Sequence, residues 1–465
     1  MTLARRVRAL TCLVVAVATG ACITGRDYTR PPVAVPEVFR GQTSTGSASL
    51  ADAAWWDVFQ DTELQTLIRT ALERNDDAQL AAVRVLEARA QLGITRSDEF
   101  PVASAGAGVV GQRVPAALFG SASRSVGAAI LQGSASWQPD FWGRYRRATE
   151  AARAQLLATE WGRRAVMTTL VSEVADAYFG LRALDRELDV SRRTLDSREE
   201  SLRLTQVRER GGATSLVDVR QAEQLVYTAT GQIATLERTI EQQENFLATL
   251  LGGLPAPIVR GRELTDQPHP SEVPAGLPSA LLERRPDIQQ AEQQLAAANA
   301  QVAVAKTSYF PQISLTGSGG FESSALAALF SPANVIWAAA VSAVQPVFTA
   351  GRLRSQVELA EARRQEAELL YQRSVRQAFR EVSDSLVGYR KLREFREQQQ
   401  LLLASSQDAR RLADIRYQGG ATSYLEVLDA DTRLFSAELG LAQAQLTELT
   451  GLVELYRALG GGWGP

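Results

Sequence analysis

Few side chains in this chain of 465 residues are of the types that carry out covalent chemistry. His269 is the only histidine, and it stands between Pro268 and Pro270, an arrangement typical of a loop. Nucleophilic triads need a histidine beside a nucleophile, and nothing in the sequence pairs with this one. We also find no run of residues with metal-ligand spacing and no phosphate-binding glycine loop. The sequence therefore predicts no catalytic residue, no metal site and no cofactor.

Cys22 is the residue best placed for a covalent modification. A basic start, an apolar stretch and three small residues precede it: Arg5, Arg6 and Arg8, then Leu10 to Ala18, then Thr19-Gly20-Ala21. This order predicts an export signal over residues 1–21, and small residues before a cysteine are typical of bacterial lipoproteins, in which that cysteine is lipidated. The usual leucine three places earlier is Thr19 here, so cleavage near Ala21 that leaves Cys22 a free thiol is the alternative.

Acidic side chains in the last fifth of the chain form a second candidate site. Glu426, Asp429 and Asp431 follow a Gly-Gly break, and their steps of three and two place at least Glu426 and Asp429 on one helix face. Copies of this face around a symmetric channel would make a ring of like charge that attracts cations. In a single helix the same acids are a solvated face near a helix start, where the dipole favours them. The residues alone favour this simpler interpretation.

The overall composition limits the possible partners. The chain has 50 basic and 52 acidic residues, and this balance provides no field that would attract nucleic acid. Apolar residues make up 45%, which is typical of a folded protein. No segment after the signal has the ~18 uninterrupted apolar residues of a membrane-spanning helix. If the chain crosses a membrane, it must therefore do so as a closed barrel of strands.

The sequence is internally duplicated. Five motifs recur at a shift of 207 to 210 residues: Asn75-Asp76-Asp77 as Arg285-Pro286-Asp287, Phe100-Pro101 as Phe310-Pro311, Gln138-Pro139 as Gln345-Pro346, Gly143-Arg144 as Gly351-Arg352, and Gly211-Gly212-Ala213-Thr214-Ser215 as Gly419-Gly420-Ala421-Thr422-Ser423. So regular a shift over so long a span predicts two structural repeats, over residues 73–251 and 281–459. A linker over 252–280 separates them, and a tail over 460–465 follows.

Each repeat contains one very long helix. Residues 143–210 and 351–418 contain few helix breakers, and Val174, Leu181, Leu188, Leu195 and Leu202 fall seven apart, as in a coiled coil. At 1.5 Å per residue, each helix would be roughly 100 Å long. Apolar positions on more than one face indicate neighbours on both sides, as in a wall of helices, and an ordinary helical bundle is the alternative.

Four segments are predicted to be β-strands, at about 101–113, 126–139, 311–321 and 335–348. In the second of them Gln132, Ser134 and Ser136 alternate with small or apolar residues, which fits strands between lipid and water. Four strands are too few to close a barrel, and an open sheet in lipid would leave unpaired edges. Strands in a membrane therefore require several chains, whereas a soluble hairpin in each repeat is the alternative.

Four further segments carry a resemblance to a known family: Asp27-Tyr28-Thr29-Arg30-Pro31, Trp55-Trp56 with Phe59, Arg284-Arg285-Pro286-Asp287-Ile288, and Leu455-Tyr456-Arg457-Ala458-Leu459-Gly460-Gly461-Gly462-Trp463. With the duplication, they resemble the outer-membrane factor family of efflux and type I secretion ducts, especially its lipoprotein branch. The resemblance implies a mixed α and β homotrimer with a shared 12-stranded β-barrel and a periplasmic α-barrel. An equatorial belt would come from residues 22–72, the linker 252–280 and the C-terminus.

The resemblance also implies roles for residues near the two Gly-Gly turns. Gly211-Gly212 and Gly419-Gly420 correspond to the periplasmic tip that meets an adaptor protein, although turn geometry alone also explains these glycines. Glu426 and Asp429 correspond to acids that line a constricted entrance. Asp218 and Tyr417 correspond to residues that hold the entrance shut. A basic residue of that lock in some members is Thr422 here, which is a departure from the family pattern.

The expected function is that of an outer-membrane channel, not an enzyme. The resemblance implies a lipid-anchored duct that extends into the periplasm and conducts small molecules passively. Its expected partners are a periplasmic adaptor protein, an inner-membrane RND-type pump and outer-membrane lipid. Type I protein secretion is the alternative within the family, and a structural coiled-coil lipoprotein is a more distant one.

Overall fold

The computed structural model describes residues 25–42, 48–114, 124–268, 270 and 273–463. The chain forms two compact units: Met1–Pro31, Leu86–Ala158 and Ala291–Tyr371 make the first, and Pro32–Val85, Thr159–Gln290 and Gln372–Pro465 make the second. These units cut across the predicted repeats, because the long helix of each repeat contributes to both units. Cys22 and the predicted signal 1–21 lie outside the described residues.

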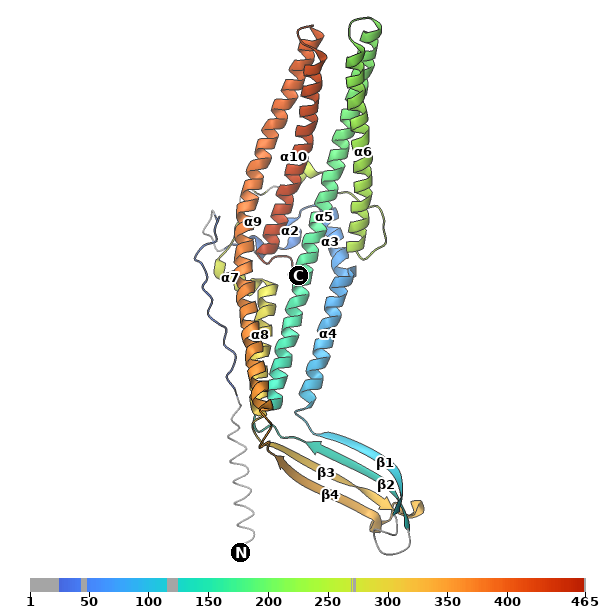
Figure 1. The fold of residues 1–465 in the computed structure, drawn as a ribbon, viewed down its shortest axis with the longest axis vertical. Coiled ribbons are helices and arrows are strands. Elements are labelled where there is room, and N and C mark those ends of the chain that lie inside the picture. The colour runs from blue at the N-terminus through green and yellow to red at the C-terminus, as the bar shows by residue number, and fades with distance from the viewer. Residues whose placement is uncertain (1–24, 43–47, 115–123, 269, 271–272, 464–465) are drawn as a thin grey trace. The chain divides into compact units, whose positions relative to one another are not determined.

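The first unit contains one antiparallel sheet. Its strands are β1 (Val102–Val114), β2 (Arg124–Trp137), β3 (Gln312–Ser323) and β4 (Val335–Val344), paired in the order β1-β2-β3-β4 (Figure 1). The largest difference from the predicted bounds is at β4, which ends four residues earlier than expected. Strands β2 and β4 both end two residues before a proline, Pro139 and Pro346, because proline cannot donate a ladder hydrogen bond.

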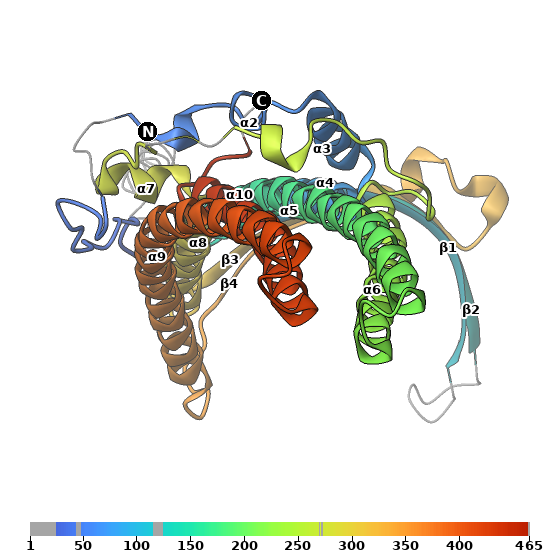
Figure 2. The ribbon, with the colours of Figure 1, turned by 90° about the horizontal axis from the view of Figure 1, so that it is seen from above.

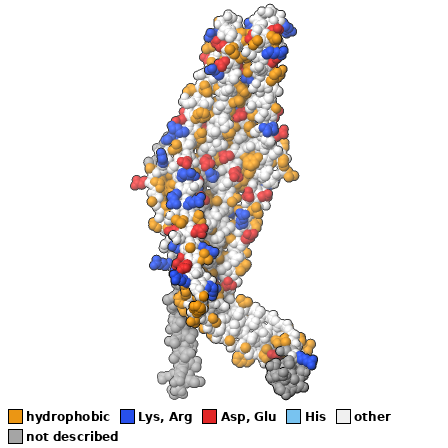
Figure 3. All heavy atoms as spheres, viewed as in Figure 1, with side chains coloured by type: hydrophobic (Ala, Val, Ile, Leu, Met, Phe, Trp, Pro, Cys, Tyr) orange, Lys and Arg blue, Asp and Glu red, His pale blue; other side chains and the backbone are white. Residues whose placement is uncertain are grey.

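The pairing register gives this sheet two different faces. Ser134 of β2 lies opposite Ser104 of β1 and Ser318 of β3, so the even-numbered residues of the strands share one face. One face carries Ser104, Gln132, Ser134, Ser136, Thr316 and Ser318, and the other carries Leu131, Ala135, Trp137, Leu315, Phe321 and Trp337. The surface drawn over the strands in Figure 3 is mainly hydrophobic or uncharged, whereas charged side chains are frequent over the helices. The predicted alternation is therefore present.

The first described residues form an extended segment on the helices of the first unit. Asp27 accepts a hydrogen bond from Nη2 of Arg147 at 2.7 Å, and Nε of Arg30 donates to Glu292 at 2.8 Å. Glu292 and Arg147 are both buried. Two ion pairs with largely buried partners thus fix the chain five and eight residues downstream of Cys22.

The helices have the same lengths in both repeats. They are α4 (Asp76–Ser97) and α8 (Pro286–Thr307) with 22 residues each, α5 (Arg144–Arg210) and α9 (Arg352–Gln418) with 67 each, and α6 (Leu216–Leu250) and α10 (Tyr424–Ala458) with 35 each. In the second unit α5, α6, α9 and α10 stand side by side in a curved row (Figure 2). Short helices α2 (Trp55–Val58), α3 (Thr62–Arg74) and α7 (Pro278–Arg284) lie along the convex side of the row. This arrangement is the predicted wall of helices.

The core of the second unit lies where this row meets the short helices. Tyr178 and Leu181 of α5, Leu247 of α6 and Val453 of α10 are fully or almost fully buried in one hydrophobic cluster. Val174 and Leu181, two of the five residues predicted to form a coiled-coil seam at seven-residue spacing, are fully buried there.

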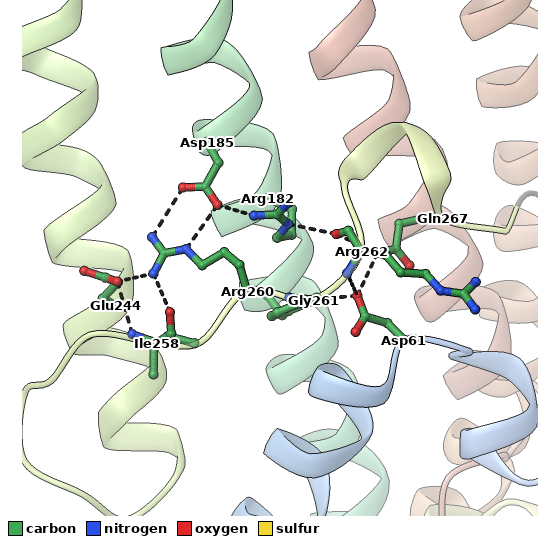
Figure 4. A network of polar contacts seen from close by, with 10 residues as sticks. Asp61, Arg182, Asp185, Glu244, Ile258, Arg260, Gly261, Arg262 and Gln267 are labelled. Atoms are coloured by element: carbon green, nitrogen blue, oxygen red, sulfur yellow. Dashed lines mark hydrogen bonds and ion pairs between the residues drawn. The ribbon is translucent and has the colours of Figure 1, made fainter.

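A buried carboxylate fixes the linker between the repeats to this core (Figure 4). Asp61 accepts hydrogen bonds at 2.9 Å from the hydroxyl of Tyr178, from Nε2 of Gln267 and from the backbone N–H of Arg262. Burial raises the pKa of Asp61, but the hydrogen bonds from Gln267 and Tyr178 outweigh it and hold the pKa below its usual value. A Cβ on Gly261 would lie 2.1 Å from Asp61, so only glycine fits there.

Among the described residues, no helix combines the length and apolar character needed to span a membrane. In the same part of the chain, no three His, Cys, Asp or Glu side chains come together as metal ligands would.

Candidate functional site

The two Gly-Gly turns lie at the same end of the second unit, where α5 joins α6 and α9 joins α10 (Figure 1). Gly212 and Gly420 both have φ of +72°, a left-handed conformation that favours glycine. The N–H of Ala213 donates to Arg208 O at 2.8 Å, and that of Ala421 donates to Arg416 O at the same distance. Both turns are therefore Schellman motifs, which satisfy the last carbonyls of a helix.

The first turn of each following helix is closed by an acid and a threonine. Asp218 accepts hydrogen bonds from the hydroxyls of Thr214 and Ser215, and it also closes a capping box at the start of α6. The hydrogen bond from Thr214 is the main reason why the pKa of Asp218 lies below its usual value. Glu426 likewise accepts from Thr422, and it also pairs with Arg416 at 3.2 Å.

Glu426 and Asp429 line one open groove between α9 and α10, of about 590 Å³. The rest of its wall consists mostly of small residues: Ser405, Ser406, Ala409, Ala430, Thr432, Ser436 and Ala437. Asp429 also pairs with Arg433, one turn further along α10, at 2.9 Å. The structure thus brings together the two acids that the sequence placed on one face.

Asp431 points elsewhere, into a contact between the two helical hairpins. Its carboxylate accepts a hydrogen bond from Nε of Arg198 at 2.9 Å and lies 3.6 Å from Nε of Arg410. Arg198 also donates to the backbone oxygen of Leu225 at 3.1 Å, and its side chain is only 3% exposed. This contact, which joins α5, α6, α9 and α10, was not predicted from the sequence. The available signal was an arginine at position 198 where the second repeat has Ser406.

Two more contacts join the hairpins along the same face of α5. The hydroxyls of Ser201 and Tyr424 are 2.8 Å apart, and the guanidinium of Arg208 lies 4.6 Å from the ring centre of Tyr417. Positions 198, 201 and 208 recur at helical spacing, so one stripe of α5 holds the second hairpin. We call these three contacts, Arg198–Asp431, Ser201–Tyr424 and Arg208–Tyr417, the hairpin joint.

Asp218 and Tyr417, which the resemblance pairs in a lock, do not share a hydrogen bond within one chain. The hydroxyl of Tyr417 is buried and has no hydrogen-bond partner among the described residues. The partners of Asp218 lie in its own turn, as described above.

The sequence profile of the family described as outer membrane efflux protein matches this chain twice, at residues 67–253 and 277–461. The two matches cover the two repeats in turn, so the same family profile recognises both halves of the chain.

Individual relatives match over nearly the whole chain. The probable efflux pump outer membrane protein TtgC of Pseudomonas putida is 36% identical, over 98% of this chain and 95% of its own. The cation efflux system protein CusC of Escherichia coli O6:H1 is 35% identical, over 97% of both chains. The crystal structure of the open state of the MtrE outer membrane channel of Neisseria gonorrhoeae superposes with a TM-score of 0.87, at 33% identity over 95% of this chain and 99% of the other.

The fold and these matches define a class, the outer-membrane efflux channels, which combine an α-barrel with a β-barrel. Members of this class are channels and not enzymes. The chain belongs to the outer membrane efflux protein family. It is an outer-membrane channel of an efflux pump that extends into the periplasm, as the resemblance implied.

Proposed function

We propose that three copies of the chain form one duct, which works with a periplasmic adaptor protein and an inner-membrane RND-type pump. The observation that carries the proposal is the open sheet, in which β1 and β4 each pair on one side only among the described residues. In lipid such edges must be paired, and neighbouring copies supply the partner strands. Three copies give 12 strands, within the range of known closed barrels.

The cargo of this duct is small molecules. Relatives are named for efflux of toluene, of antibiotics and of cations, which share little chemistry. The polar groups on the polar face of the sheet are mainly hydroxyls and amides, and such a lining conducts without strong selection. Choice among substrates therefore belongs to the inner-membrane pump.

The entrance to the duct lies at the Gly-Gly turns. Glu426 and Asp429 of each copy line the narrow opening and give it a ring of negative charge. Gly211-Gly212 and Gly419-Gly420 present the tip to the adaptor. The hairpin joint supports a closed resting state, because α9 and α10 cannot swing away from α5 until the Arg198–Asp431 ion pair separates. Asp218 and Tyr417 restrain the same tip in the assembled trimer.

Lipid on Cys22 anchors the duct to the membrane. Asp27 is the fifth residue after Cys22, a span of at most about 18 Å. Asp27 is bound to Arg147, one turn beyond Trp142, whose ring stacks on Phe310 at 4.9 Å beside the ends of the strands. A lipid on Cys22 therefore reaches the level at which aromatic side chains border the strands.

Single-channel recording in planar bilayers tests the proposed entrance. The double variant Glu426→Gln and Asp429→Asn should reduce the preference for cations, because it removes the ring of charge. Asp408→Asn, at an exposed site on α9 that pairs with Arg411, is the matched control and should leave the preference unchanged. A purified wild-type protein that forms no pores, or is monomeric in detergent, would refute the duct itself. Unchanged selectivity in the double variant would refute only the charged entrance.

A further inference from the structure

The connection between β3 and β4 has an unusual composition for an exposed loop. Residues 324–334 read Ser-Ala-Leu-Ala-Ala-Leu-Phe-Ser-Pro-Ala-Asn and contain no charged side chain. Leu326 is 71% exposed and Phe330 is 70% exposed. Loops in contact with water are usually polar, and exposed groups of large apolar side chains mark a binding or membrane surface.

Part of the backbone of the loop is hydrogen-bonded within the loop itself. Two turns of 3-10 helix, η4 (Leu326–Ala328) and η5 (Pro332–Asn334), give it a regular structure. Ala328 N–H donates to Ala325 O at 3.0 Å, Ser331 N–H to Ala328 O at 3.0 Å, and Asn334 N–H to Ser331 O at 2.9 Å.

Side chains add further hydrogen bonds within the loop. Asn334 Nδ2 donates to Ala328 O at 2.7 Å, and the backbone N–H of Ala325 donates to the hydroxyl of Ser323 at 3.2 Å. Internal pairing of this kind is what a segment needs where water is scarce.

The apolar side chains of the loop continue the apolar face of the sheet. The ring of Phe330 packs edge-on against that of Phe321, with their centres 5.5 Å apart. Phe321 lies opposite Leu131 and Val335, and Trp337 follows on the same face with 79% of its surface exposed. The loop is also at the end of the strands far from α8 and α9, which join β3 and β4 at their other ends (Figure 1).

We propose that the β3–β4 loop, Ser324–Asn334, rests in the outer leaflet of the outer membrane, with Leu326 and Phe330 in contact with lipid. The loop then extends the lipid-contacting surface beyond the last hydrogen-bonded residues of β3 and β4. The occupant is lipid because the loop continues the face that carries Trp337 and Leu131, and not the hydroxyl-bearing face. A lid over the pore or a contact between copies would place Phe330 against protein.

Photocross-linking in intact cells tests this placement. The photoreactive residue p-benzoylphenylalanine replaces Phe330 in the full-length chain, and irradiated products are probed for lipopolysaccharide and for chain-to-chain adducts. We expect a lipid adduct at Phe330 and at Trp337, and none at Ser318, which lies on the opposite face of β3. The Trp337 and Ser318 variants are the matched controls.

The outcomes separate the loop from the sheet. A lipid adduct at Trp337 but not at Phe330, or an adduct between two chains at Phe330, overturns the proposal for the loop and leaves the orientation of the sheet standing. A lipid adduct at Ser318 in place of Trp337 overturns the orientation of the sheet, and the proposal for the loop with it.

Discussion

In both α6 and α10 the carbonyl of the last residue accepts a hydrogen bond from a side chain, but the donor differs between the two repeats. Asn75, at the start of the first repeat, donates from Nδ2 to the carbonyl of Leu250 at 3.0 Å. Arg285 takes the same place in the second repeat and donates from Nη1 to the carbonyl of Ala458 at 3.0 Å. Both acceptors are the last residues of helices with 35 residues.

This comparison shows which features duplication has preserved. A carbonyl at a helix end needs a donor, and either an amide or a guanidinium can provide one. Arg285 additionally pairs with Asp287 and with Glu381, each at 2.7 Å, and Asn75 caps α4 instead. The backbone requirement is therefore common to both repeats, whereas the charges are particular to one.

Removing Arg285 should have the larger effect of the two. Arg285→Ala leaves Glu381 without its ion-pair partner and Ala458 O without its donor, and we expect the free energy of unfolding to fall by about 3 kcal/mol. Asn75→Ala should lower it by about 1 kcal/mol through the lost cap. Denaturant unfolding of the purified protein in detergent measures both. Equal losses would contradict the comparison, and Arg285→Asn should recover part of the difference.

The next largest loss of stability is expected at the hairpin joint. Arg198→Ala breaks a buried ion pair, although Arg410 stays close to Asp431, so we expect a loss of about 2 kcal/mol. The same variant should raise single-channel conductance, because only the Ser201–Tyr424 contact then holds α10 to α5. Arg203→Ala, at an exposed site of α5 that pairs with Glu200, is the control and should change neither quantity. A charge exchange, Arg198→Asp with Asp431→Arg, should restore low conductance, and continued high conductance would argue against the joint.

Asp176 of α5 predicts a pH dependence. Burial, together with the nearby charge of Glu454, raises the pKa of Asp176 to about 7. Because the folded state holds this proton more tightly than the unfolded chain, stability falls as the pH rises from about 4 towards 7. Asp176→Asn should therefore be more stable than the parent at pH 8, by about 1.5 kcal/mol, and similar to it at pH 4. Asp384→Asn is the matched variant in the second repeat. Thermal unfolding at pH 8 and pH 4 measures the stability of both variants and of the parent. An Asn variant with no advantage at pH 8 would refute the assignment.

The smallest effect concerns the caps of the two turns. The lowered pKa of Asp218 means that its contribution is present above about pH 4 and is lost as the pH falls through the folded-state pKa. Asp218→Asn should lower stability at pH 7 by about 0.5 to 1 kcal/mol, and the difference should disappear near pH 2. Glu426→Gln should weaken the matching hydrogen bond from Thr422, because the amide oxygen still accepts but carries no charge, and, unlike Asp218→Asn, it should also alter cation preference.

Much of the architecture could be predicted from local patterns. The long helices and the strands follow from breakers such as Gly211 and Pro139 and from alternation along β2, which are features of short segments. The repeats follow from short motifs that recur at a nearly constant shift. The grouping of Glu426 with Asp429 follows from helical spacing in the same way. These predictions required no knowledge of which segments meet.

The contacts between distant segments could not be predicted in this way. Arg198 and Asp431 are 233 residues apart in the chain, and neither has a neighbour in sequence that reveals its partner. Asp61 caps the start of α3, and it also binds Tyr178 and the linker at Arg262. Such pairings depend on tertiary packing, and one sequence carries no record of them.

The order of the strands has a consequence for the symmetry of the proposed trimer. The two hairpins of the sheet, one from each repeat, join through β2 and β3 by the same antiparallel pairing that joins neighbouring strands elsewhere. Around a closed wall of three chains, six nearly equivalent hairpins would alternate, giving an approximate six-fold arrangement. The helical hairpins of the two repeats would alternate in the same way. They are made unequal only by sequence differences between the repeats, such as Arg198 in the first and Ser406 in the second. An aperture formed by unequal hairpins can widen by moving three of them while the other three stay in place.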